Sequence, residues 1–133
     1  MTVPLVAGLR GEARLDSVQP GDLAAALGSG DVAVLGTPRV LALAEAATVD
    51  AVLPALAADE TSVGVSVRLR HLAPTTLGGW VLASAELVAC ERRRLQFRVE
   101  VRDAGGLVAE GEIERAIVKR TSFLAAAYAR TSH

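Results

Sequence analysis

The feature that most constrains the fold is a change in hydrophobic period near Asp59. From Thr37 to about Ala58 the chain is rich in Ala, Leu and Val, and its pattern predicts one long helix that is apolar on nearly every face. We expect Thr37 to cap the first amides of this helix and Pro54 to kink or separate its last turn. Such a helix is normally wrapped by the rest of the fold, which the following residues must supply.

After Asp59 the apolar residues alternate with polar ones, which predicts half-buried strands. The first of these strands places Val63, Val65, Val67 and Leu69 inward, and the same parity puts His71 on the apolar side. Further strands are predicted over residues 81–89, 95–102 and 107–119, with an edge strand at 11–17, a short helix or turn at 20–29 and a final short helix from residue 121.

Short turns join the four long strands, and short connections imply an antiparallel sheet. A twisted antiparallel sheet wrapped around one long central helix buries both elements, and this arrangement is the hotdog fold. A chain of 133 residues has room for one domain of this kind. We therefore expect a single α+β hotdog domain over residues 1–133.

Composition excludes several classes of function. The net charge is −1 and aromatic residues make up 3% of the chain, which argues against a nucleic-acid-binding protein. The one cysteine, Cys90, excludes an internal disulfide, and the two histidines, His71 and His133, show no metal-ligand spacing. We see no convincing signal peptide or membrane span, and expect a cytoplasmic location. Only Lys119 among 14 basic residues is a lysine, which suggests a bacterial, GC-rich origin.

Three ionisable residues interrupt the apolar pattern. Glu45 shares a helix face with Leu41 and Val49, so its carboxylate is either functional or extends to a helix edge. His71 is either functional or a core histidine bonded to a backbone carbonyl. Arg115 occupies an inward position of the last strand, where its charge needs a carboxylate, a phosphate or solvent. Helix capping alone explains Thr37, which is the weakest of these signals.

These residues lie in a sequence pattern that resembles the fluoroacetyl-CoA thioesterase-like group of hotdog proteins. The pattern comprises residues 34–45, then Gly64 and residues 70–71, with residues 111–118 similar to the family's final strand. Thr37 and Glu45 are 8 residues apart, Glu45 and His71 are 26 apart, and His71 and Arg115 are 44 apart, as in the family. The resemblance extends over about residues 11–128.

The resemblance implies a homodimer or a higher oligomer that hydrolyses short acyl-CoA thioesters, with coenzyme A as part of the substrate and no other cofactor or metal. Its catalytic residues fall on Thr37, Glu45 and His71, and its substrate-contacting residues on Gly64 and Arg115. The family enzyme specific for fluoroacetyl-CoA has an aromatic lid residue ahead of the threonine. Residues 28–33 of this chain contain no aromatic residue, so we expect an ordinary small acyl group.

Two mechanisms fit these residues. Either Thr37 attacks the thioester while His71 takes its proton and Glu45 orients the imidazole, or Glu45 or His71 activates a water that Thr37 positions. Amides near Gly64 are candidate oxyanion donors, and a packing or bulge glycine is the alternative. The candidates for binding the phosphates of CoA are Arg39, Arg68, Arg70 and residues 92–94. For residues 92–94 a solvated turn is the favoured interpretation. A non-catalytic acyl-CoA-binding protein and a hotdog hydratase or dehydratase remain alternatives.

Overall fold

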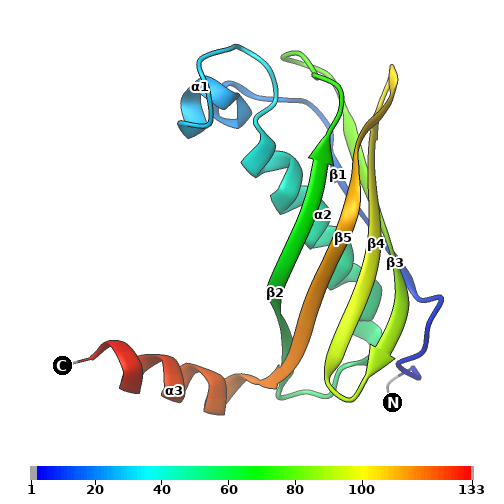
Figure 1. Ribbon diagram of the computed structural model, residues 1–133, viewed down its shortest axis with the longest axis vertical. Helices are drawn as coiled ribbons and strands as arrows, with labels where there is room; N and C mark the ends of the chain where they lie inside the picture. Colours follow the sequence, from blue (N-terminus) through cyan, green and yellow to red (C-terminus); the bar gives the residue numbers. More distant parts are fainter. Residues whose placement is uncertain (1–2, 133) are drawn as a thin grey trace.

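A computed structural model of the protein describes residues 3–132 and shows one curved antiparallel sheet with a long helix across its concave face (Figure 1). The strand order is β1-β3-β4-β5-β2. The strands are β1 (Arg10–Leu15), β2 (Glu60–His71), β3 (Val81–Glu91), β4 (Arg94–Asp103) and β5 (Gly106–Lys119). The helices are α1 (Ala24–Leu27), α2 (Thr37–Val52) and α3 (Arg120–Thr131), with 3-10 turns η1 (Pro20–Asp22) and η2 (Leu53–Ala55). The predicted α+β architecture is confirmed.

Helix α2 packs against the sheet through small residues, so the two backbones approach closely. The position that a Cβ would take at Gly11 of β1 is already filled by backbone atoms of Ala47 and Ala51. Any side chain at Gly11 would therefore push β1 away from the helix. The largest buried side chains of the core are Phe97, Leu35, Leu87, Leu95 and Ile113.

The ends of α2 differ from the prediction at one residue. Gly36, not Thr37, is the N-cap, and Thr37 is the first helical residue with no capping bond from its side chain. At the other end the α-helix stops at Val52, and Leu53–Ala55 form a separate 3-10 turn. This agrees with the predicted effect of Pro54, because its ring and missing N–H disrupt a helix at this point.

Three irregularities in strand register correct the predicted alternation. The ladders shift between Gly64 and Ser66, between Leu87 and Ala89, and between Val101 and Arg102. Each shift reverses which face the following residues occupy. The inward assignment of Val63 was therefore wrong, because Ser62 occupies the inner face beside it. In β4 the alternation holds, and Leu95, Phe97, Val99 and Val101 are all buried.

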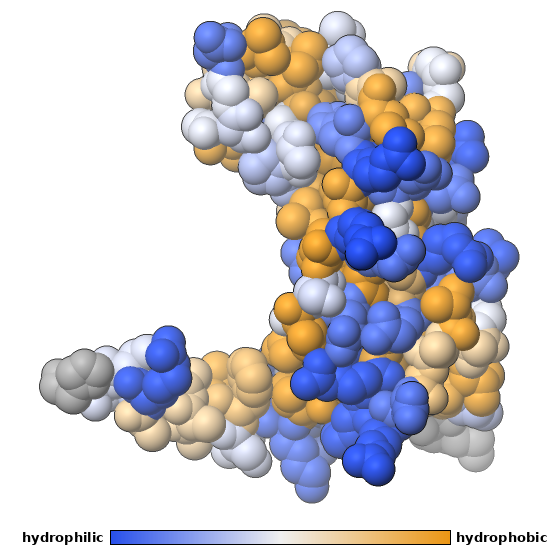
Figure 2. All heavy atoms as spheres, viewed as in Figure 1, coloured by the Kyte–Doolittle hydropathy of each residue, from blue (hydrophilic) through white to orange (hydrophobic). Residues whose placement is uncertain are grey.

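One flank of the single chain leaves apolar residues uncovered. The exposed residues include Val49 of α2 and Leu53 of η2, and along the edge strand β2 they include Val65 and Val67. Apolar side chains line the hollow flank between α1 and α3 (Figure 2). The helix is thus less fully wrapped within one chain than its composition predicts.

Candidate functional site

The hydroxyl of Thr37 and the imidazole of His71 are in direct contact. Thr37 lies at the first position of α2, His71 is the last residue of β2, and Thr37 Oγ1 is 2.8 Å from His71 Nδ1. The hydroxyl makes this bond instead of a helix cap, so capping no longer explains the residue. A hydroxyl held on an imidazole nitrogen is the arrangement that activates a nucleophile or positions a water.

The second nitrogen of the imidazole has no partner in the chain. His71 Nε2 is buried and, among the described residues, forms no hydrogen bond. When the Thr37 hydroxyl donates to Nδ1, Nε2 carries the ring proton and needs an acceptor such as a carboxylate. A core histidine bonded to a backbone carbonyl, the alternative from the sequence, does not describe this geometry.

A second group of polar residues surrounds Arg115 on β5. Its guanidinium is buried and donates from Nε to Ser62 Oγ at 3.0 Å and from one terminal nitrogen to the Ser62 carbonyl at 2.9 Å. The other terminal nitrogen donates to Glu45 Oε2 at 3.2 Å. The alternation of the last strand placed Arg115 on the inner face correctly. Ser62 gave no signal in the sequence, and it faces inward because of the register shift that follows it in β2.

Burial and the neighbouring carboxylate shift the pKa of Arg115 in opposite directions. Burial lowers the pKa of the Arg115 guanidinium from its ordinary value, and the Glu45 carboxylate raises it. A guanidinium stays protonated in proteins, so Arg115 holds a fixed positive charge beside Glu45. The Glu45 side chain is 35% exposed, against 7% for Arg115, so the carboxylate predicted to be buried in fact borders the open flank of α2.

Gly64 provides room for the Glu45 carboxylate. A Cβ at Gly64 would lie 2.8 Å from Glu45 Oε2, so a larger residue would displace the carboxylate. Gly64 pairs with Arg115 in the ladder, and His71 pairs with Ala109, so both residues face α2. An uninterrupted strand would place Gly64 and His71 on opposite faces, and the bulge at Val65 corrects this.

The five residues singled out from the sequence form two groups within one chain. Thr37 contacts His71, and Glu45 contacts Arg115 beside Gly64. Thr37 and Glu45 are eight residues apart on α2, which corresponds to about 12 Å along the helix axis. Among the described residues no hydrogen bond or ion pair joins Glu45 to His71. The expected convergence of all three catalytic candidates is therefore not reached inside a single chain.

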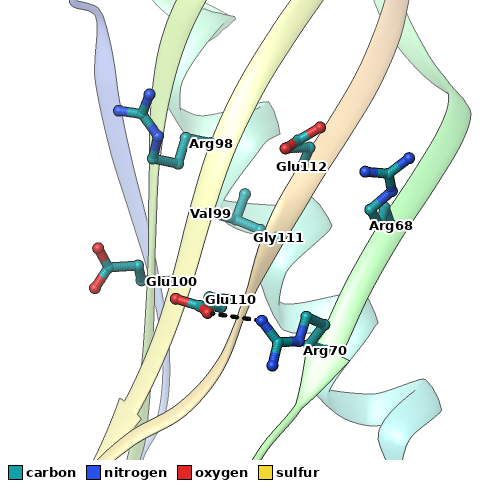
Figure 3. A pocket seen from close by; sticks show the side chains of 8 residues that line it. All are labelled: Arg68, Arg70, Arg98, Val99, Glu100, Glu110, Gly111 and Glu112. Atoms are coloured by element: carbon teal, nitrogen blue, oxygen red, sulfur yellow. Dashed lines mark ion pairs between the residues drawn. The ribbon is translucent and has the colours of Figure 1, made fainter.

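A charged hollow of about 350 Å³ lies on the opposite, outer face of the sheet. Figure 3 shows arginine and glutamate side chains from β2, β4 and β5 around Gly111, with α2 behind the sheet. Arg68 faces Glu112 across the ladder, and Arg70 pairs with Glu110 at 3.5 Å. Such exposed cross-strand ion pairs are typical of a solvated face.

Several of the arginines considered for the CoA phosphates are already paired with carboxylates. Arg39 pairs with Asp22 at 3.0 Å, Arg93 with Glu60 at 2.6 Å and Arg94 with Glu114 at 2.7 Å. Arg92 and Arg93 form the turn between β3 and β4, which agrees with the turn that the sequence favours. Arg68 and Arg70 lie on the outer face, away from Thr37 and Glu45.

The structure also bears on a metal site and on a membrane-spanning helix. Within residues 3–132, no three His, Cys, Asp or Glu side chains lie close enough together to hold a metal ion, and His133 lies outside the described residues. No helix in that part of the chain has the length and apolar character needed to cross a membrane.

Comparison with known proteins gives the same family from sequence and from structure. The family model described as fluoroacetyl-CoA-specific thioesterase matches residues 18–121. The fluoroacetyl-CoA thioesterase of Streptantibioticus cattleyicolor is 36% identical over 90 residues, which are 68% of this chain and 65% of that protein. The matched segment is thus just under two thirds of the relative's length.

Solved structures show the same fold over nearly the whole chain. A variant of the fluoroacetyl-CoA-specific thioesterase FlK superposes with a TM-score of 0.90 at 29% identity and covers 98% of this chain and 100% of its own. A thioesterase superfamily member from Thermus thermophilus superposes with a TM-score of 0.84 at 27% identity, covering 92% of this chain and 90% of its own. The hotdog fold expected from the sequence is confirmed.

Proposed function

Because this chain belongs to the fluoroacetyl-CoA-specific thioesterase family, we propose that it hydrolyses acyl-CoA thioesters to a free acid and coenzyme A. The observation that carries the proposal is the bond from the Thr37 hydroxyl to His71 Nδ1, made by a threonine that does no capping. We further propose a cytoplasmic, bacterial protein that acts as a homodimer on small or short-chain acyl groups. No cofactor is invoked, since the CoA arrives as part of the substrate.

The chemistry follows from what each group can do with a proton. His71 Nδ1 accepts the proton of Thr37, or of a water held by Thr37, as the oxygen attacks the thioester carbonyl. A carboxylate beside the ring stabilises the imidazolium that forms, and the imidazolium returns the proton to the departing thiolate. When Thr37 is the attacking oxygen, His71 then takes a proton from a water that hydrolyses the acyl-threonine ester and releases the free acid. Donors near Gly64 and the fixed charge of Arg115 stabilise the negative charge that develops on the carbonyl oxygen.

The separation of the two groups supports a site shared between two chains. In the single chain β2 is an edge strand, and an exposed edge with apolar residues is suited to pairing with a second copy. Antiparallel pairing of two β2 strands moves the His71 end of one strand toward the Gly64 end of the other. Glu45 of the partner subunit would then lie nearer the Thr37–His71 pair.

The test is release of free thiol from a panel of acyl-CoAs. We expect turnover by the native chain, and a loss of about 10²-fold to 10³-fold in kcat for Thr37→Ala, His71→Ala and Glu45→Gln. Thr61→Ala, on the face of β2 opposite Ser62, is the matched control and should retain full activity. Thermal unfolding confirms that each variant folds.

Two outcomes would favour the alternatives. Tight binding of acyl-CoA with no thiol release by the native chain would identify a non-catalytic binding protein. Addition of water to an enoyl-CoA without release of thiol would identify a hydratase.

Specificity for the acyl group is tested with the same assay. Residues 28–33 supply no aromatic side chain ahead of Thr37, so nothing in that segment singles out a fluorine atom. We therefore expect kcat/KM for fluoroacetyl-CoA to stay within about tenfold of that for acetyl-CoA. A preference of several orders of magnitude would contradict this part of the proposal.

A further inference from the structure

Helix α3 extends away from the sheet with its apolar side uncovered (Figure 1). It contains no buried residue, and Phe123, Leu124 and Tyr128 are 42%, 47% and 68% exposed. These three residues, with Ala127, lie on one side of the helix, whereas Ala125 and Ala129 lie on the other. The side formed by residues 123, 124, 127 and 128 is called here the apolar side of α3.

A helix of this size is not expected to be stable without a partner. α3 has 12 residues, and isolated helices shorter than about 12–15 residues are marginal in water. Its own chain offers little support, because only its first turn lies against the end of β5. Stability of α3 therefore requires another surface.

The base of α3 forms a groove of about 580 Å³ whose composition indicates what it accepts. Val118 and Phe123 form its apolar lining, and Lys119 adds positive charge, whereas Arg93 is paired with Glu60. The helix itself carries Arg120 and Arg130 and no acidic residue. This groove suits a segment with exposed apolar side chains and a negative charge.

The opposite end of the same chain presents a segment of that kind. Leu27 and Val32 are 41% and 56% exposed, and Asp31 between them is exposed as well. This segment lies beside the Thr37 end of α2, since Leu23 bridges to Leu35 and Leu35 donates to the Thr75 carbonyl just beyond β2. In one chain it cannot reach α3, which follows the Glu60 end of the β2–β5 pair.

A second copy brings the two surfaces together. When two β2 strands pair in antiparallel directions, the Glu60 end of one strand lies next to the His71 end of the other. α3 leaves the body on the side of the free β2 edge, toward the place of the second copy (Figure 1). We propose that the apolar side of α3 docks on residues 27–32 of a second copy of this chain, beside the partner's Thr37 and His71.

This inference rests on the homodimer of the proposed function and is tested by crosslinking. In a Cys90→Ala background, Val32→Cys is combined with Ala127→Cys on the apolar side of α3, or with Ala129→Cys on the other side as the matched control. A short bis-maleimide reagent should give a band of doubled mass at least about fivefold faster for the first pair, because a helix is about 10 Å wide. Absence of that band, equal rates, or an internal crosslink at single-chain mass would overturn the inference.

Dimer strength provides the second readout. Phe123→Asp with Leu124→Asp should raise the dimer dissociation constant at least about tenfold in sedimentation experiments, because it places charges in the interface. Ala125→Asp with Ala129→Asp adds the same charge to the other side of α3 and should change the dimer dissociation constant little. Both variants should fold, since α3 contributes no buried residue. Equal effects of the two variants would contradict docking through the apolar side.

The two proposals fail in different ways. A native dimer that releases thiol but gives no α3 crosslink refutes this inference alone. An active native monomer refutes both this inference and the proposed homodimer, and leaves the thioesterase activity intact. If the Ala127→Cys variant gives the crosslink but the native chain releases no thiol, the proposed function is refuted and the docking of α3 stands.

Discussion

At the scale of single residues, the Thr37 hydroxyl contacts His71 and the Glu45 carboxylate contacts Arg115. Polar residues at apolar positions identified Glu45, His71 and Arg115. Helix capping, a short-range rule, gave the wrong reason for Thr37, whose hydroxyl bonds to a residue 34 positions away. Ser62 was missed because an ordinary serine in a strand shows its role only when its partner across the ladder is known.

Gly64 allows the position of the Glu45 carboxylate to be tested without removing a functional group. We expect Gly64→Ala to fold with a loss of less than about 1 kcal/mol, because only the flexible end of Glu45 must move. The displaced carboxylate should reduce kcat/KM at least about tenfold in the thiol-release assay.

Gly111→Ala is the control for this prediction. Its Cβ would overlap the Arg68 carbonyl, a backbone atom that cannot yield, so we expect a loss of about 2 kcal/mol or more in chemical denaturation. Full activity in Gly64→Ala would show that the carboxylate need not be held where Arg115 holds it.

At the scale of elements, alternation predicted well where the ladder is regular and failed where it is not. β4 is regular over Leu95 to Val101, and its inward set was correct throughout. β2 contains a bulge at Val65, and a bulge depends on the neighbouring strand and not on the local sequence pattern. The parity that correctly placed His71 therefore misplaced Val63 and hid the inward position of Gly64.

Glu60 links the start of β2 to two neighbouring segments and should make stability depend on pH. The Ala57 amide and then the Arg93 guanidinium hold the pKa of this carboxyl below its ordinary value of 4.5. A carboxyl with a lowered folded pKa stabilises the protein above its unfolded pKa, and this contribution is lost as pH falls through the folded value. Native protein should therefore unfold at a higher temperature than Glu60→Gln at pH 7, with the difference shrinking as pH falls below the ordinary value of 4.5 and through the lowered folded pKa.

Thermal scans between pH 7 and pH 3 check this prediction. Arg93→Met removes the second donor but keeps the Ala57 bond, so it should lower the unfolding temperature at pH 7 less than Glu60→Gln does. A difference between the native protein and Glu60→Gln that stays constant over the whole range would contradict the assignment.

At the scale of the whole molecule, the sequence predicted the architecture but not the division of the site. Spacing along the chain singled out the candidate residues, yet it contains no information about the distance between elements. The two groups lie at different positions along α2, and under the proposed dimer a second chain would bring them together. Under this proposal, catalysis requires the dimer.

Mixing two inactive variants tests whether each site draws on both chains. Glu45→Gln and His71→Ala subunits, mixed and allowed to exchange, should regain about a quarter of the native activity, because half the dimers are mixed and each has one intact site. The control mixes His71→Ala with Thr37→Ala. These two residues share one chain, so every site in the mixed dimer keeps a defect and no activity should return. No recovery in the first mixture would place the whole site in a single chain.

The distance between the two groups on α2 also has a kinetic consequence. When a working centre needs both subunits, the specific activity of the protein falls on dilution below the dissociation constant, and the rate then varies with the square of protein concentration. Cellular abundance would in that case set not only how much of this protein is present but also what fraction of it is competent.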